Sequence, residues 1–386
     1  MSLPMPQTSG MAAIVGDGRR RALLGLAAVS TAVPRLVHAE PRVDKKRIFI
    51  VSSYSRDYIW SKSTQRGVNA GMLKYGYLDS EAQGEALMRN DQVESRRAVI
   101  RKEWMDTKRH NSRSEIAVST RRIVEEIGRF RPDLVLLGDD NAANYIGNQL
   151  LGGDTPVVFW GVNGLPLKYG LIENLDAPGR NVTGVWQSGY HKESLELLKR
   201  LVPTAKTFAI LACDSETSRP NVKMIEQLAK RDALPLRLAD TIVTNSYEEF
   251  KRRALEASRK VDAFFVLNHD TLRDAQGRYV DMLDVGRWYL ENIRIPEASH
   301  EDQFVHEGML LTANDSGFNQ GYMALEMANL ILEKRSTPAR MAVRTPDRGP
   351  YLVNKIRADQ LRISLTESLF MIDEVITHSV ALGRKR

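Results

Sequence analysis

The chain has 386 residues, of which 42% are hydrophobic and 27% charged, with 26 glycines, 15 prolines and one cysteine. This length exceeds the roughly 100–200 residues of one ordinary domain, so it predicts two, and the apolar content excludes a disordered chain. The single cysteine, Cys213, excludes an internal disulfide framework and a cysteine-based zinc cluster. The net charge of +7 suggests a nucleic-acid partner, which the positions of the basic residues must test.

The N-terminal segment has the pattern of an export signal. Arg19, Arg20 and Arg21 precede an apolar run at residues 22–33, and a small-residue cleavage pattern ends at Ala39. The run is shorter than the ~20 apolar residues that a membrane-spanning helix needs. We expect residues 1–39 to be a signal peptide cut near Ala39, which places the mature protein in the periplasm. A core or amphipathic helix is the alternative interpretation.

The leader also explains part of the charge. The residues from Arg20 to Leu24 resemble the twin-arginine export consensus, with the Sec route as the alternative, and no cysteine follows the run to carry a lipid anchor. Removing residues 1–39 takes away four arginines and one aspartate, so the net charge falls to +4 (7 − 4 + 1). The basic residues at 96–113 are interleaved with acidic ones, which predicts a solvated helix face and no nucleic-acid partner.

Short apolar runs alternate with amphipathic stretches along the rest of the chain. This alternation predicts a parallel sheet with helices on both faces, in two Rossmann-like α/β lobes. In chain order, the expected strands are at residues 47–53, 134–138, 156–161, 207–212, 236–243, 263–267, near 294–296 and 308–312. The expected helices are at residues 61–75, 92–129 (with a break near 110–112), 140–151, 191–201, 221–230, 247–259, 279–292 and 317–333.

The glycines and prolines of residues 163–186 interrupt this periodicity and predict a crossing between the lobes. We expect lobe 1 at residues 40–164, with residues 313–336 returning to it, and the hinge crossing at 165–186. Lobe 2 then spans residues 187–312, with 337–365 returning to it, and residues 366–386 form a C-terminal helix or tail.

Polar and aromatic residues follow the predicted strands. Ligands of parallel α/β sheets bind beyond the carboxyl ends of the strands, so these side chains are candidate ligand contacts. They mix aromatic, hydroxyl, amide and carboxylate groups, which suits a small polar or zwitterionic ligand. The candidates are Ser53, Tyr54, Asp140, Asn141, Trp160, Asn163, Asp214, Asn268, Asp270, Asn314 and Asp315. Helix capping is the alternative for the aspartates, and a core position is the alternative for Tyr54 and Trp160.

Signals of catalysis are weak. The sequence lacks a G-x-S-x-G elbow, a Walker loop and a G-x-G-x-x-G after the first strand. His269 and His300 stand beside acidic residues but have no metal-ligand spacing, so hydrogen bonding or capping is favoured for both. Cys213 has no cation near it in sequence and is expected to be a packed thiol. We therefore expect no catalytic residue, no metal site and no cofactor.

Several segments resemble, in collinear order, the substrate-binding proteins of bacterial ABC importers with the type I periplasmic-binding fold. That family includes tryptophan- and tyrosine-binding members, and the resemblance covers roughly residues 46–365. The longest of the matching segments is PGRNVTGVWQSGYHKESLELLKRLVPTAKTFAILACDS, which begins at Pro178. The others are RPDLVLLGDDNAANY, TPVVFWGVNG, VDAFFVLNHDTL, EDQFVHEGMLLTANDSGFNQGYMALEMANLIL and YLVNKIRADQLRISL.

The resemblance implies two lobes joined by three crossings, which trap a ligand when the hinge closes. By position, it implies ligand contacts from Ser53, Tyr54, Asp140 and Trp160 in lobe 1, from Asp214, Asn268 and Asp270 in lobe 2, and from Asn314 and Asp315 at the return crossing. The turns GDDNAAN and FWGVNG depart from the family pattern at the expected cleft, so the ligand does not follow from the amino-acid-binding members.

These expectations describe an exported, monomeric solute-binding protein without catalytic activity, which delivers its ligand to the permease of an ABC importer. Ligand contacts from both lobes would shift the population toward a closed state. One alternative keeps the fold and makes the protein a periplasmic sensor that signals to a histidine kinase or similar receptor. A second alternative is an exported α/β enzyme that uses His269 or His300.

Overall fold

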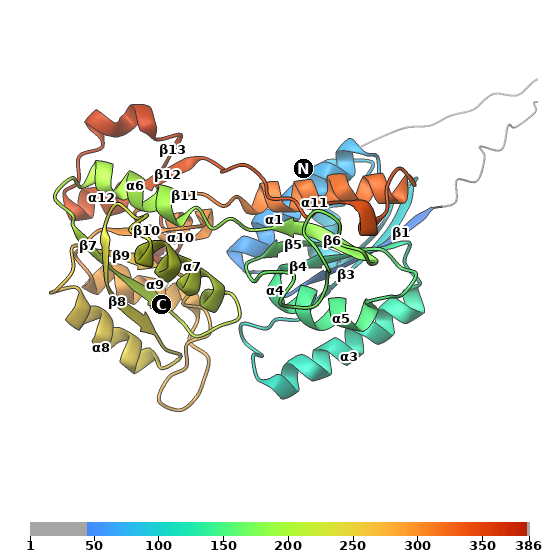
Figure 1. The fold of residues 1–386 in the computed structure, drawn as a ribbon, viewed down its shortest axis with the longest axis horizontal. Helices are drawn as coiled ribbons and strands as arrows, with labels where there is room; N and C mark the ends of the chain where they lie inside the picture. Colours follow the sequence, from blue (N-terminus) through green and yellow to red (C-terminus); the bar gives the residue numbers. More distant parts are fainter. Residues whose placement is uncertain (1–44, 384–386) are drawn as a thin grey trace, which may run out of the picture. The chain divides into compact units, whose positions relative to one another are not determined.

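A computed structural model of the chain describes residues 45–383 and contains two β-sheets (Figure 1). The predicted signal peptide therefore lies outside the described residues. In the first sheet, all neighbouring strands are parallel except the pair β2–β3. The strands are, in order across the sheet, β2 (Gln92–Glu94), β3 (Ala98–Trp104), β1 (Lys46–Ser52), β4 (Leu134–Gly138), β5 (Val157–Val162) and β6 (Val182–Trp186).

The second sheet has the same mostly parallel character, with β12 antiparallel to β11. Its strands are, in order across the sheet, β13 (Glu374–Ile376), β12 (Tyr351–Asn354), β11 (Leu311–Ala313), β10 (Glu297–Ser299), β9 (Ala263–Val266), β7 (Thr207–Ala212) and β8 (Arg237–Val243). Each sheet with the helices packed on it is called a lobe below, so the first sheet belongs to lobe 1 and the second to lobe 2. The predicted two-lobed α/β fold is confirmed.

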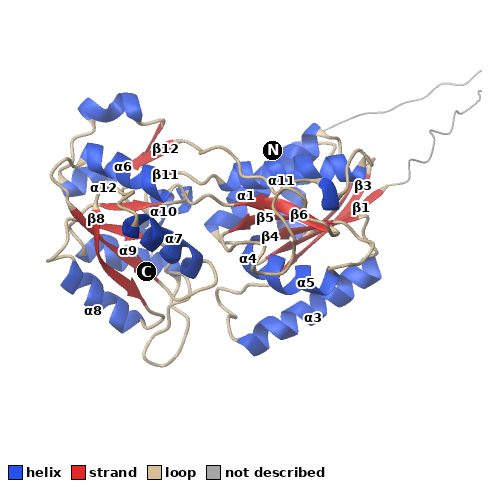
Figure 2. Ribbon diagram, viewed as in Figure 1, coloured by secondary structure: helices blue, strands red, loops and turns tan. Residues whose placement is uncertain are grey.

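Helices cover both faces of each sheet (Figure 2). Those of lobe 1 are α1 (Ile59–Lys74), α2 (Glu81–Asn90), α3 (Arg113–Phe130), α4 (Asp139–Asn141), the π-helical η1 (Ala142–Ile146), α5 (Gly147–Leu150) and α11 (Gly317–Leu332). Those of lobe 2 are α6 (His191–Leu201), α7 (Ser218–Lys230), α8 (Tyr247–Ala257), α9 (Met282–Asn292), α10 (Asp302–Glu307), α12 (Lys355–Leu361) and α13 (Val380–Gly383). Two 3-10 turns, η2 (Pro338–Arg340) and η3 (Thr366–Met371), complete the elements.

The two faces of β1 show why these strands lack polar alternation. Ile48 and Ile50 pack into a cluster with α1 and α11, whereas Phe49 and Val51 pack into a cluster with α3. Successive strand residues point to opposite faces, so a strand covered on both sides is apolar throughout. In lobe 2, Phe208 and Ile210 likewise meet α6 and α7, and the alternate residues of β7 meet α8 and α9.

The chain passes between the lobes three times. It leaves lobe 1 after β6, returns between β11 and α11, and leaves again between η2 and β12. After the second passage, the chain is anchored in lobe 1 because α11 packs along α1 (Figure 1). The strands therefore bring residues from distant parts of the chain to the same sheet edge.

The structure corrects three sequence predictions. Residues 92–104 form the strands β2 and β3 rather than a helix, and the helix starts only at Arg113, where Ser112 and Glu115 form a capping box. The predicted crossing at 165–186 ends in β6, a strand of the first sheet. The predicted C-terminal helix or tail at 366–386 contains β13, which pairs with β12.

Candidate functional site

Glu301 is the centre of a group of buried carboxylates at the carboxyl ends of strands from both sheets. It follows β10 and is 2% exposed. Asp139, Asp302 and Asp315 are also buried, and Glu301 acts on the pKa of each of them. We call Asp139, Glu301, Asp302 and Asp315 the acidic cluster. Its members come from the end of β4, the start of α10 and the loop after β11.

Burial raises the pKa of three of these carboxylates and so disfavours their charged form. Desolvation, with a smaller contribution from Glu301, raises the pKa of Asp302 to about 6. Desolvation also raises the pKa of Asp315 to about 6, although hydrogen bonds from Gly189 and Gln320 oppose the shift. For Asp139, desolvation and the neighbouring Asp140 and Glu301 raise the pKa well above its ordinary value. Like charges that share a desolvated site behave in this way.

The polar atoms around Glu301 that lack a hydrogen-bond partner are mostly acceptors. Gln303 and Gln187 direct their amide nitrogens to Glu301, at 2.6 Å and 3.5 Å from its carboxylate oxygens. Their amide oxygens and the Oδ1 atom of Asp302 are buried and have no partner within the described residues. Leaving a buried polar atom without a partner costs about 1–3 kcal/mol. The cluster is therefore built to receive hydrogen-bond donors.

His300 adds two ring nitrogens to this region. It is 0% exposed, and neither nitrogen has hydrogen-bond geometry to any described residue. Its Nε2 atom nevertheless lies 3.2 Å from Glu301 Oε1. The ring centroid lies 5.7 Å from that of His191, with the two rings tilted by 30°. Burial and the proximity of His300 lower the pKa of His191 to about 3. The neutral His191 instead contacts Asn221 through its Nε2 atom, 2.9 Å from Asn221 Oδ1.

Aromatic side chains of lobe 1 border the acidic cluster. The indole Nε1 of Trp60 donates to Asp139 Oδ1 at 2.6 Å, and the hydroxyl of Tyr58 donates to Asp270. The backbone of Asp139 adopts a left-handed conformation, with φ of 70°. Strained backbone of this kind persists where the surrounding structure imposes it, and often at functional sites.

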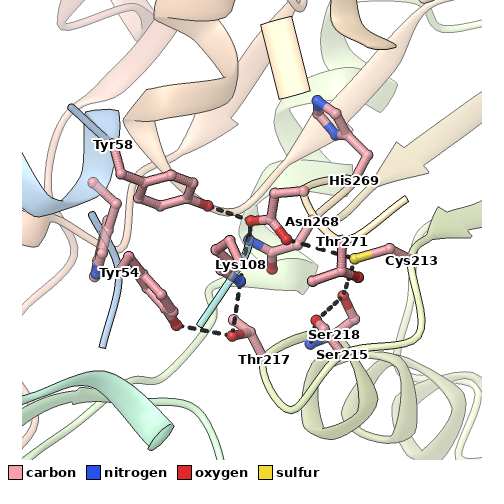
Figure 3. Close-up of polar contacts among 12 residues, drawn as sticks. Tyr54, Tyr58, Lys108, Cys213, Ser215, Thr217, Ser218, Asn268, His269 and Thr271 are labelled. Atoms are coloured by element: carbon pink, nitrogen blue, oxygen red, sulfur yellow. Dashed lines mark hydrogen bonds and ion pairs between the residues drawn. The ribbon is translucent and has the colours of Figure 1, made fainter. Parts of the chain in front are cut away.

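Direct side-chain contacts join the two lobes (Figure 3). The Tyr54 hydroxyl lies 2.9 Å from Thr217 Oγ1, and Lys108 Nζ lies 3.1 Å from Asp270 Oδ2. Tyr54 and Lys108 follow β1 and β3 of lobe 1, whereas Thr217 and Asp270 follow β7 and β9 of lobe 2. Burial would raise the pKa of Asp270, but the Lys108 ammonium and the Tyr58 hydroxyl outweigh it and lower that pKa.

A polar cavity of about 300 Å³ adjoins these contacts. Residues of both lobes line it, so we call it the interlobe cavity. Lys108 borders the cavity, and its charge also lowers the pKa of Asp139 in the acidic cluster. The lining residues are Thr107, Lys108, Asn111, Arg113, Ile116, Asn141, Tyr145, Asp214, Ser215, Glu216, Thr217, Arg219, Asn245 and Thr271.

Several residues predicted as ligand contacts have structural partners. Ser53 Oγ donates to the carbonyl of Gly138 at 2.6 Å and accepts from the amide of Ala142. Asp140 accepts hydrogen bonds from Asn163, Gly164 and Tyr169, which fixes the turn after β5. These contacts hold the strand ends in place, and the ligand role of both residues stays a prediction.

Others lie at the interface of the lobes. Asn163 Oδ1 accepts from Asn221 of lobe 2 at 2.8 Å, and Asn141 lines the interlobe cavity, where its Oδ1 atom has no partner within the described residues. Asn268 and Asp270 contact each other at 3.2 Å, and the Oδ1 atom of Asn268 is similarly unpartnered. Asp214 lines the cavity but is paired with Arg219 at 2.7 Å.

Trp160 and Asn314 have structural roles in the described residues. Trp160 is 0% exposed and packs in the lobe 1 core with α1 and α11, the alternative that the sequence left open. Asn314 Oδ1 accepts from the backbone amide of Asp302 at 2.9 Å. It thereby positions the start of α10, and its ligand contact stays a prediction.

The predicted ligand contacts did not include three members of the acidic cluster, Asp139, Glu301 and Asp302. They also left out Lys108, Thr217, Gln187 and Gln303. Lys108 stood in a segment interpreted as a solvated helix, although its side chain is only 5% exposed. The signal that could have found it is the apolar Ala98 and Ile100 two residues apart, which mark a strand whose end carries Lys108 to the sheet edge.

His269 and Cys213 are buried and have structural surroundings. His269 Nε2 lies 2.8 Å from Glu307 Oε1, with both side chains buried. The Cys213 thiol is buried, and desolvation and Asp270 raise its pKa, so it is not an activated nucleophile. Among residues 45–383, no group of three or more His, Cys, Asp or Glu side chains has an arrangement that could hold a metal ion.

Comparison with known families explains this architecture. Residues 100–375 match the family described as ABC transporter substrate binding protein. The chain belongs to this family. Among curated relatives, it is 27% identical over 203 residues to a tyrosine-binding protein of Clostridioides difficile, a match that covers 52% of this chain and 55% of that relative. The comparable region thus spans little more than half of the relative's length.

Solved structures share the fold of this substrate-binding protein. A domain from Streptococcus pneumonia in complex with L-Trp has a TM-score of 0.67 and 22% identity, and the match covers 86% of this chain and 100% of that one. A ligand-free, open substrate-binding protein with adhesive properties from Clostridium difficile has a TM-score of 0.61 and 23% identity, with 86% and 99% covered. Among residues 45–383 of this substrate-binding protein, no helix combines the length and the apolar character needed to cross a membrane.

Proposed function

We propose that this substrate-binding protein captures a small amino acid and that the acidic cluster binds its ammonium group. The observation that carries the proposal is the surplus of buried acceptors around Glu301. An ammonium group offers three donors and a positive charge, which would satisfy unpartnered oxygens and stabilise the carboxylates together. The relatives named for tyrosine and bound to L-Trp support an amino acid as the ligand class.

The aromatic side chains fit the remainder of such a ligand. Trp60 and Tyr58 are buried beside the cluster, and their hydrogen bonds to Asp139 and Asp270 hold the rings in place. Ligand pockets of this kind combine apolar or aromatic walls with a few placed polar groups. An amino acid with an apolar side chain is the substrate class that these walls favour.

Capture would couple the ligand to closure because the acidic cluster has members in both lobes. Asp139 follows β4 of lobe 1, and Glu301 follows β10 of lobe 2. A cation between them stabilises the state in which both approach it, so binding shifts the population toward that state. The protein would then deliver the unchanged ligand, as a monomer outside the cytoplasm, to the permease of an ABC importer.

The test is a thermal-shift screen of the protein from residue 40 onward against amino acids, their decarboxylated and deaminated analogues, sugars and nucleosides. A ligand at 100 times its Kd that binds only the native state stabilises it by ~2.7 kcal/mol. We expect amino acids and amines to give shifts, and deaminated analogues to give none. Stabilisation by a sugar or nucleoside alone would contradict the proposal.

The variant Glu301→Gln then tests the site. It keeps the shape of the side chain and removes its charge, so we expect affinity for the amino acid to fall by roughly 10- to 100-fold in calorimetry. Glu256→Gln is the matched control, because Glu256 pairs with Arg252 on the exposed surface of α8. Equal loss in both variants, or no loss in Glu301→Gln, would place the ligand elsewhere.

A further inference from the structure

Tyr54, Tyr58, Thr217 and Asp270 surround a single ammonium group, and we call these four residues the ammonium box. Figure 3 shows Tyr54, Tyr58 and Thr217 around Lys108. The group that they enclose is Nζ of Lys108. It lies 3.1 Å from Asp270 Oδ2 and 3.2 Å from Thr217 Oγ1. It also lies over the Tyr54 ring, 4.3 Å from the ring centroid, and 5.8 Å from that of Tyr58.

This combination of groups is the chemistry by which proteins bind ligand cations. A carboxylate neutralises the charge, a hydroxyl accepts a hydrogen bond, and aromatic faces attract the cation through their quadrupole. The side chains of Lys108 and Asp270 are 5% and 1% exposed, so water screens the pair little. The aromatic part of the box comes from lobe 1, and its carboxylate and hydroxyl come from lobe 2.

We propose that the ammonium box is a cation-binding site that the protein fills with its own Lys108. Lys108 then acts as a covalently tethered ligand that joins the two lobes. By occupying this site, it also limits the captured solute to one ammonium group. Lys108 is held to lobe 1 by the short segment between β3, which ends at Trp104, and α3, which begins at Arg113. Lys108 and Asn141 also both line the interlobe cavity.

The limit of one ammonium group on the captured solute follows from the charges at the site. Lys108 neutralises Asp270 and occupies its place beside that carboxylate, so only the carboxylates around Glu301 remain to bind the ammonium group of the solute. A second ammonium on the solute would have to displace Lys108 from the box, and two cations in one desolvated site repel each other strongly. The selectivity part of the inference rests on the proposed amino-acid function, whereas the tethered-ligand part does not.

Chemical rescue tests the tethered ligand without any captured solute. Lys108→Ala leaves the box empty and Asp270 unpaired, so we expect Tm to fall by roughly 3–8 °C. Adding n-propylammonium chloride should restore at least half of that loss in a saturable manner. The neutral n-propanol and sodium chloride at equal concentrations should restore none.

Two variants control the rescue. Lys108→Met fills the volume without the charge, so it should be destabilised but not rescued. Lys102→Ala empties another buried lysine position, whose Nζ lies 3.7 Å from the ring centroid of Trp104 and contacts Gln65, both in lobe 1. Small-angle scattering should show a larger radius of gyration for Lys108→Ala, reversed by n-propylammonium, and no change for Lys102→Ala.

The outcomes separate the two proposals. If Lys108→Ala kept the wild-type Tm and radius of gyration, or if propanol rescued it as well as propylammonium, the tethered-ligand inference would be overturned whatever the protein binds. If rescue succeeded but no amino acid bound, only the proposed function would fail. If both held, Lys108→Ala should gain affinity for lysine relative to norleucine by at least 10-fold, and no gain would overturn the limit to one ammonium.

Discussion

Arg357 and Glu297 form a two-pronged ion pair whose side chains are both 0% exposed. The Nε and Nη2 atoms of Arg357 each lie 2.9 Å from a carboxylate oxygen of Glu297. The pair joins α12 to β10, and β10 is the strand from whose end His300 and Glu301 extend. The position of the acidic cluster in lobe 2 therefore depends on a contact with the C-terminal part of the chain.

Removing Arg357 alone should destabilise the protein severely. Arg357→Met leaves Glu297 charged and buried, so we expect the free energy of unfolding to fall by about 3–5 kcal/mol in denaturant titration. Arg357→Met combined with Glu297→Leu removes both charges and should recover most of that loss. A double variant as unstable as the single one would show that packing, rather than the lone charge, sets the cost.

Asp302→Asn should trade ligand affinity for stability. The pKa of Asp302 is raised to about 6, mainly by desolvation, from an ordinary value near 3.8, so the folded state binds more protons than the unfolded state between these pH values. Stability of the ligand-free protein therefore falls as pH rises from about 4 to about 6. At pH 7 the asparagine removes this cost, and we expect about 1–3 kcal/mol of added stability in denaturant titration.

The same carboxylates predict how ligand affinity depends on pH. Asp302 and Asp315 both have pKa values raised to about 6, mainly by desolvation, and they face Glu301, while Arg66 lies near Asp302 and His300 near Asp315. Below pH 6 they become neutral and attract an ammonium group less, so affinity for the amino acid should fall as pH decreases. Calorimetry from pH 5 to 8 measures this, and an affinity that rises on acidification would contradict a cationic ligand group.

Lys102→Met should flatten the pH dependence of stability. Burial lowers the pKa of Lys102 to about 7, so between pH 7 and the unfolded value near 10.5 the folded state binds fewer protons. Stability then rises with pH across this window in the wild type, and methionine abolishes that rise while filling a similar volume. Denaturant titrations at pH 7 and pH 9.5 compare the two proteins. An unchanged slope with pH would show that Lys102 does not cause it.

Gly321→Ala should weaken the packing of α1 against α11. A Cβ atom at Gly321 would lie 2.2 Å from the backbone oxygen of Thr64, so the helices would have to separate. Overpacking of this kind costs typically 1–3 kcal/mol. Gly128→Ala is the control, because nothing lies within 4 Å of a Cβ at that position on α3. Alanine there should stabilise the helix by about 0.5–1 kcal/mol, as measured by thermal unfolding.

The misassigned segment at residues 92–104 shows a limit of local patterns. Lys102 and Arg101 made it resemble a charged helix, but the strand buries Ala98, Ile100 and Lys102 on one face. A buried lysine satisfied by Gln65 and the Trp104 ring is invisible to a pattern that counts every lysine as solvated. The error also hid Lys108, which lies just beyond the end of this strand.

Most of the helices and strands, and the family resemblance, could be predicted from the sequence, because strand and helix patterns depend on residues a few positions apart. Runs such as residues 134–138 are apolar throughout because both faces of the strand are covered, and the sequence pattern alone indicates such a strand. The contacts between polar residues of distant segments became visible in the folded chain. Lys108 and Asp270 are 162 positions apart (270 − 108), and Ser63 and Asp302 are 239 apart. The pairing of such residues depends on how the two lobes pack, which no local pattern records.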